Sequence, residues 1–178
     1  MSCLNSLKGL KYDFCEPNLA GVKEVYLTDD FDNLTVTAVT SAMTITAISG
    51  ATFYGYQMEK QQGYYTSTPT FNDNGRLQYY TNAVRIAFDK LSADKHLEFL
   101  ALTHNPTKAI VLDNNGVYHF IGFDSYLTPS DGLAQTGQNY GDNNGYEVTL
   151  NAQSAYPSFI VPADVAATVI SEPDTVAE

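Results

Sequence analysis

The chain has 178 residues and a formal net charge of −11, from 20 acidic and 9 basic side chains. This length fits a single domain with a sizeable core. A chain this acidic repels phosphate backbones, which argues against a DNA- or RNA-binding module. The acidic excess either serves solubility, the simpler interpretation, or lines a passage along which nucleic acid slides without sticking.

Residues 1–21 are expected to form an N-terminal arm. Cys3 and Cys15 are the chain's two cysteines, too few for a disulfide framework, so they form one bridge or stay as free thiols in a reducing compartment. The arm has no apolar run of signal-peptide length, and no run anywhere is long enough to span a membrane. We therefore expect a protein that is made in a cytoplasm and has no membrane partner.

Alternation of apolar and polar side chains predicts β-strands through most of the chain. Tyr80, Val84, Ile86 and Phe88 share one face of an extended segment, as in a strand with one buried side. Similar alternation or short apolar runs predict further strands at residues 22–28, 34–39, 43–48, 109–112, 117–121 and 146–150.

Asn-Gly pairs at residues 74–75, 115–116 and 144–145 separate these segments. Asn and Gly tolerate the positive φ angles of type I′ turns, whose twist matches that of paired strands, so each pair predicts a hairpin. The Asp- and Asn-rich loops around the last two pairs lack the alternating ligands and the distal Glu of an EF-hand. We therefore predict turns there rather than calcium sites.

Residues 92–103 have the spacing of an amphipathic helix. Ser92 is a suitable N-cap, and residues 104–106 end the helix with a proline. A single helix of this kind plugs one open side of a sandwich or barrel. The side chains expected to face the sheet are Leu91, Leu97, Leu100 and Ala101.

Residues 53–71 fit a compact core poorly, because both faces carry Tyr and polar side chains. Gly63 or the turn at residues 72–75 would reverse the chain, which predicts a long hairpin. An exposed edge of this kind aggregates unless a partner covers it, so we expect contact between subunits; the alternative is a twisted hairpin over its own core. The aromatic residues expected at the contact are Phe53, Tyr54, Tyr56, Tyr64, Tyr65 and Phe71.

The predicted fold is mostly β: an antiparallel β-sandwich or barrel over residues 22–161, with one flanking helix and the long extended hairpin. Residues 162–178 contain two prolines and four acidic side chains. They predict an acidic C-terminal arm, docked on a neighbour or disordered.

The sequence has no pattern typical of an active site. His96, His104 and His119 lack a Cys or carboxylate at ligand spacing, so surface or capping roles are preferred to metal binding. A solvated loop explains the acids at residues 29–32 better than a catalytic pair does. Nucleophile elbows, phosphate-binding glycine loops and H-E-x-x-H motifs are missing. We expect no enzyme activity, no cofactor and no metal.

Three stretches carry a resemblance to a known family. They are GVKEVYLTDD (residues 21–30), VRIAFDKLSADKHLEFLALTHNPTKAIVLDNNGVYHFIGF (84–123) and TGQNYGDNNGYEVTLNAQSAYPSFIV (136–161). With the long hairpin between the first two, they resemble tail-tube-like and ring structural proteins of tailed bacteriophages, especially crAss-like phages that infect Bacteroidetes. The match covers residues 21–161 and includes no catalytic motif.

The resemblance implies a homo-oligomeric ring, six-fold or twelve-fold, in the tail or neck of the virion, beside other tail or portal-associated proteins. Such a ring is assembled in the bacterial cytoplasm and lets DNA pass without binding it specifically. Acidic side chains should line the channel, since each Lys or Arg that met a phosphate would add a sticking point. The candidate lumen acids are Asp29, Asp30, Asp32, Asp124 and Asp131.

The alternative from another class is a non-catalytic β-sandwich module that binds carbohydrate or protein. Its exposed Tyr side chains would stack on sugar rings. A ring contains many copies whereas a binding module is usually a monomer, so particle mass separates the two hypotheses.

Overall fold

The structure is a computed structural model that describes residues 18–58, 62–139 and 141–171. It is mostly β, as predicted, and its two sheets form a sandwich-like fold that does not close into a barrel. Two helices accompany the sheets where one was expected. Cys3, Cys15, most of the predicted N-terminal arm and the last residues of the predicted C-terminal arm lie outside the described residues.

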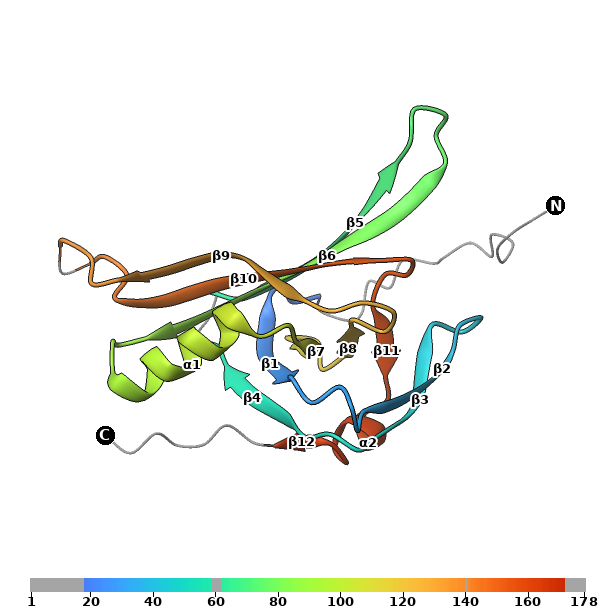
Figure 1. Ribbon diagram of the computed structural model, residues 1–178, viewed down its shortest axis with the longest axis horizontal. Helices are drawn as coiled ribbons and strands as arrows, with labels where there is room; N and C mark the ends of the chain where they lie inside the picture. The colour runs from blue at the N-terminus through green and yellow to red at the C-terminus, as the bar shows by residue number, and fades with distance from the viewer. Residues whose placement is uncertain (1–17, 59–61, 140, 172–178) are drawn as a thin grey trace.

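The large sheet has eight strands in the order β12-β4-β1-β7-β8-β11-β3-β2 and lies below the small sheet in Figure 1. Most neighbours are antiparallel, while β11 runs parallel to β3 and β12 parallel to β4. The strands are Val22–Thr28 (β1), Thr35–Val39 (β2), Thr44–Ser49 (β3), Phe53–Gln57 (β4), Lys108–Asp113 (β7), Tyr118–Ile121 (β8), Phe159–Val161 (β11) and Ile170–Ser171 (β12).

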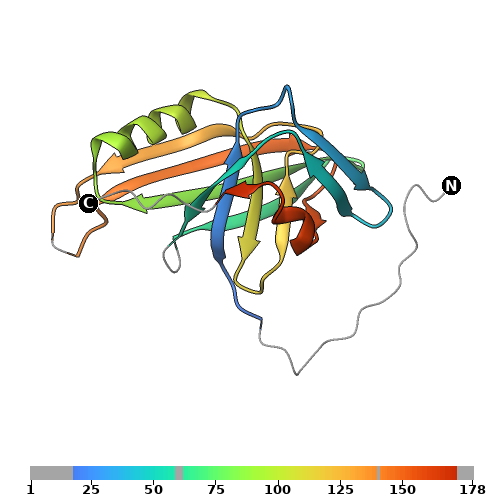
Figure 2. The ribbon, with the colours of Figure 1, turned by 90° about the horizontal axis from the view of Figure 1, so that it is seen from below.

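The small sheet is antiparallel, in the order β5-β6-β10-β9. Figure 2 shows the helix α1, Ala93–His104, running along this sheet on its β9 side. The strands are Tyr64–Phe71 (β5), Leu77–Asp89 (β6), Thr128–Gln135 (β9) and Gly145–Ser154 (β10).

Two apolar clusters hold the domain together, one on each face of the large sheet. The first fills the space between the sheets, where Val25 and Val111 meet Ile86 and Val148. The second covers the opposite face. Because β7 has apolar neighbours on both faces, its consecutive residues from Ala109 to Leu112 are all buried, which explains why this strand is apolar throughout instead of alternating.

Helix α1 begins and ends where predicted, but its buried face was predicted wrongly. The Ser92 side chain accepts the Lys95 amide at 3.3 Å as an N-cap. Leu97 and Leu100 are 66% and 53% exposed, whereas Leu102 is buried and Phe99 packs beside it. The face is set by β9 and β10, against which α1 packs, with the Phe99 ring beside Gly132 of β9.

Two of the three Asn-Gly pairs form the predicted hairpin turns. Gly75, at φ +70°, joins β5 to β6, and Gly116, at φ +83°, joins β7 to β8. The third prediction was wrong, because Gly145 is the first residue of β10, paired with Asp89 and Gln135. The reversal between β9 and β10 is made by the longer loop before it.

Replacing Gly116 with Val should destabilise the domain by at least about 1–2 kcal/mol, the cost of left-handed backbone for a residue with a Cβ. A Cβ at this position would meet nothing within 4 Å, so the expected loss comes from the backbone conformation. Gly141→Val is the matched control, since Gly141 also has open space and its φ is not positive. Urea denaturation of both variants measures the difference, and equal midpoints would contradict the turn assignment.

The long hairpin exists, but it is not formed by residues 53–71. Residues 53–57 are β4 of the large sheet, paired with β1, whereas residues 64–71 are β5 of the small sheet, paired with β6. The chain changes sheets after Met58, whose buried side chain joins the first cluster and whose sulfur accepts the Ala87 amide at 3.4 Å. The extended hairpin is therefore β5–β6, reversed by residues 72–75.

The start of the predicted C-terminal arm belongs to the domain. The short helix α2, Ala163–Ala166, places Ala166 in the second cluster together with Val169. Ile170 and Ser171, which follow Val169, form β12 and pair with β4. These small and β-branched side chains complete the edge of the large sheet, which the proline and acidic composition of the segment obscured.

Candidate assembly surfaces and an adjoining pocket

The far end of the β5–β6 hairpin projects beyond the rest of the domain (Figure 1). β10 accompanies β6 only as far as Tyr80, which pairs with Ser154, so the hairpin beyond this point is two-stranded. There Phe71 pairs directly with Leu77, and their side chains are 58% and 41% exposed. The hairpin tip therefore presents an apolar pair that its own domain leaves uncovered.

The turn of this tip is held by one side chain. Asn72 Oδ1 accepts the Arg76 amide at 2.8 Å and the Asn74 amide at 3.2 Å. The Gly75 amide donates to the Asn72 carbonyl at 2.8 Å. These bonds pre-organise the tip, which lowers the entropy cost of docking it against a partner.

The small sheet has two free edges. Within the described residues, β5 pairs with β6 alone and β9 with β10 alone. Unpaired strand edges are templates for pairing with another chain. Pro69 in β5 and Pro129 in β9 each remove a backbone donor, so a partner meets interrupted edges, and unlimited sheet growth is disfavoured.

Three of the six aromatic residues predicted at a subunit contact pack against other parts of their own chain. Phe53 is fully buried in the second cluster, with its ring 6.2 Å from that of Phe120. Tyr65 packs against the first cluster, and its hydroxyl accepts the Ser158 amide at 3.3 Å. Tyr56 lines a pocket described below.

The other three aromatic residues are exposed to solvent, but they lie on different strands or at opposite ends of one strand. Tyr54 is 60% exposed on β4 of the large sheet. Tyr64, 41% exposed, and Phe71 lie at opposite ends of β5 in the small sheet. Of the predicted set, Phe71 alone lies at the projecting tip.

The structure brings four of the five candidate lumen acids into neighbouring loops. Those of residues 29–32 follow β1, and Asp124 follows β8; the rings of Phe31 and Tyr126, 4.9 Å apart, join the two loops. Asp131 is separate, on β9, beside a hollow that also contains the ion pair of Arg85 and Glu147. The five acids do not form one cluster.

Asp124 has a structural role that sequence reasoning missed. Its carboxylate accepts the hydroxyl of Ser154 and, at 2.7 Å, the amide of Ala155. These bonds tie the loop after β8 to the end of β10. The Asp29 carboxylate has fewer structural hydrogen bonds than that of Asp124. The Asn105 side-chain amide, Nδ2, donates to its Oδ2 at 3.3 Å.

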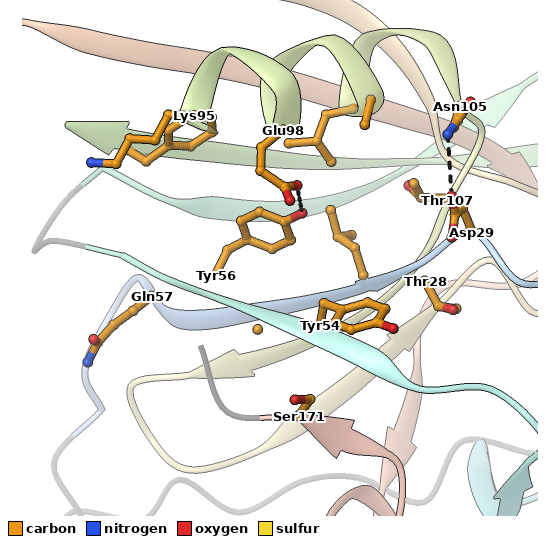
Figure 3. Close-up of a pocket in the computed structure, with 15 residues that line it drawn as sticks. Thr28, Asp29, Tyr54, Tyr56, Gln57, Lys95, Glu98, Asn105, Thr107 and Ser171 are labelled. Atoms are coloured by element: carbon orange, nitrogen blue, oxygen red, sulfur yellow. Dashed lines mark hydrogen bonds between the residues drawn. The ribbon is translucent and has the colours of Figure 1, made fainter. Parts of the chain in front are cut away.

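A pocket of about 510 Å³ lies between α1 and the strands β1 and β4 (Figure 3). Leu27, Phe88 and Leu102 contribute apolar wall. In the middle, the Tyr56 hydroxyl donates to Glu98 Oε2 at 2.9 Å. The right-hand end of the view has the Asp29–Asn105 pair, and Gln57 and Lys95 lie at the left.

The Tyr56 hydroxyl stays neutral. Burial raises the pKa of Tyr56 far above its usual range, and the negative charges of Glu98 and Asp29 raise it further. A tyrosine held in this form is a hydrogen-bond donor rather than a base or nucleophile.

The histidines act in packing and hydrogen bonding. His104 Nδ1 lies 2.9 Å from the Leu100 carbonyl at the end of α1, and the His96 ring packs edge-on against Tyr146. In the described part of the chain, no three His, Cys, Asp or Glu side chains are placed to hold a metal ion. Helices long and apolar enough to cross a membrane are also missing from that part.

Sequence reasoning missed the residues that complete the pocket and the tip. Glu98, Asn105 and Thr107 belong to no motif, and they line one pocket because α1 and the residues after it lie opposite β1 and β4, as Figure 3 shows. Leu77 follows the turn at residues 72–75, so its place beside Phe71 was available from the hairpin register.

Comparison of the chain with protein-family models, curated proteins and solved structures finds no match.

Proposed function

We propose that the chain is a structural subunit of a ring in the tail or neck of a tailed-phage virion, built from many copies around a channel for genome passage. The observation that supports this best is the projecting tip with its exposed Phe71–Leu77 pair. Apolar surface on an extended, pre-organised element is typical of a contact with another chain. A neighbouring copy would bury it.

The free edges of β5 and β9 support the same proposal, because a ring needs two different surfaces that meet head to tail. The net charge of −11 agrees with a conduit that does not retain DNA. The resemblance of residues 21–161 to tail-tube-like proteins supports the virion assignment. We propose that the acids of residues 29–32 face the channel. Asp124 is a weaker candidate, because its carboxylate is engaged in structural hydrogen bonds.

Mass photometry of the purified full-length chain tests the proposal. The expected result is particles with the mass of a closed ring, a fixed multiple of 19.5 kDa, over a wide range of concentrations. A monomer at all concentrations would contradict it. A monomer that also bound oligosaccharides would favour the alternative, a β-sandwich binding module with exposed Tyr54 and Tyr64.

Imaging of the ring tests the channel separately. We expect Asp and Glu to outnumber Lys and Arg on the inner wall, because an acidic wall repels DNA over a Debye length of ~8 Å at physiological salt. A ring whose channel is lined mainly by Lys and Arg would overturn the conduit function and leave the ring assembly in place.

A further inference from the structure

The domain has two uncovered surfaces that could form the two sides of one contact. The first is the hairpin tip, with its exposed Phe71–Leu77 pair. The second is the pocket between α1 and the strands β1 and β4, where the exposed Tyr54 and Ala101 and the half-buried Phe88 offer apolar surface. Its volume of about 510 Å³ falls within the range of binding pockets, ~300–1,000 Å³.

The tip and the pocket cannot meet within one chain. β6 is a continuous strand of 13 residues from Leu77 at the tip to Asp89, about 40 Å at roughly 3.3 Å per residue, and α1 begins beyond its far end. Figures 1 and 2 accordingly show the tip and α1 toward opposite ends of the molecule. Two unlike surfaces at opposite ends suit a head-to-tail contact between copies, which can close into a ring.

The charges of the two surfaces are complementary. Arg76 is exposed on the tip and, in the described part of the chain, forms no ion pair. The pocket has Glu98 in its middle and Asp29 at the right-hand end of Figure 3, and its single cation, Lys95, lies at the left. The tip also carries an acid, Asp73, which the Lys95 end would attract. The charges therefore favour one orientation of a docked tip.

We infer that the hairpin tip of one copy docks into the pocket of the next copy, with Phe71 and Leu77 on its apolar surface and Arg76 toward Glu98. The apolar pair is the anchor, because a few buried apolar side chains carry most of the free energy of an interface, while the charges set its orientation. This inference rests on the proposed ring and adds to it the surface that receives the tip.

Filling the pocket tests it without touching the tip. Ala101→Trp occupies the hollow without adding charge and should weaken assembly at least about tenfold, measured as the concentration at which half of the protein is in rings. Ala93→Trp, the same change at an exposed position of α1 outside the lining, is the control and should assemble like the wild type. Circular dichroism checks that both variants fold. Equal assembly of the two variants would overturn the docking.

Charge reversal tests the orientation. Arg76→Glu and Glu98→Lys should each weaken assembly about tenfold, because each brings two like charges together. The double reversal restores opposite charges and should recover most of the loss. Losses that simply add in the double variant would overturn the placement of Arg76 toward Glu98.

Crosslinking of the full-length protein separates this inference from the ring proposal. In a chain with Cys3→Ser and Cys15→Ser, the pair Asn74→Cys and Ala101→Cys should give a ladder of covalent multimers with a short bis-maleimide, because each copy carries both sides of the contact. Either cysteine alone should give nothing larger than a dimer. Rings without the ladder would overturn the docking and leave the ring proposal in place. A ladder without particles of ring mass would support the docking and overturn the ring, and a monomer without a ladder would overturn both.

Discussion

Introducing charge at the hairpin tip should abolish ring assembly and leave the domain folded. In the double variant Phe71→Asp/Leu77→Asp, the exposed apolar pair becomes two carboxylates that a partner cannot bury without counter-charges. Two anchors worth about 2 kcal/mol each correspond to a loss of roughly a thousandfold in affinity between neighbouring subunits. Mass photometry should then show the 19.5 kDa monomer where the wild type forms rings.

The fold of this variant should survive because the tip contributes nothing to either apolar cluster. Circular dichroism and the urea midpoint check this. Leu97→Asp/Leu100→Asp on α1 is the matched control, since both leucines are more than half exposed and the charge change is the same. Loss of the ring in both double variants would mean that added negative charge, rather than the tip, prevents assembly.

Replacing Phe53 with Ala should destabilise the isolated domain by about 3–5 kcal/mol, the range for a buried Phe. Phe53 is 0% exposed and packs in the second cluster with Phe120 and Phe159, so its removal leaves a cavity. Tyr54→Ala, one residue along and 60% exposed, should cost much less. Urea denaturation measures both changes.

This pair of variants distinguishes the two roles considered for residues 53–71. If Phe53 contacts a neighbouring subunit, its replacement lowers assembly and leaves the monomer's unfolding unchanged. If it belongs to the core, the monomer itself loses stability. Equal, small losses for Phe53→Ala and Tyr54→Ala would contradict the packing of β4 described above.

Local patterns in the sequence determine the elements of this protein. Alternation predicted the central part of β6 and the start of β10 because a strand with one buried face repeats every two residues. Ser92 and the proline after α1 delimit the helix through backbone bonding, which is local. The turns at Gly75 and Gly116 follow from the conformational freedom of glycine at positive φ.

The tertiary structure decides which elements meet. Phe53 and Phe71 look alike in sequence, yet one is buried and the other exposed, because β4 pairs with β1 in the large sheet and β5 with β6 in the small one. The buried face of α1 is likewise set by the strands it packs against, β9 and β10, and not by the spacing of its own leucines. Such pairings join residues far apart in the chain, and their free energy comes from burying surfaces that no local repeat encodes.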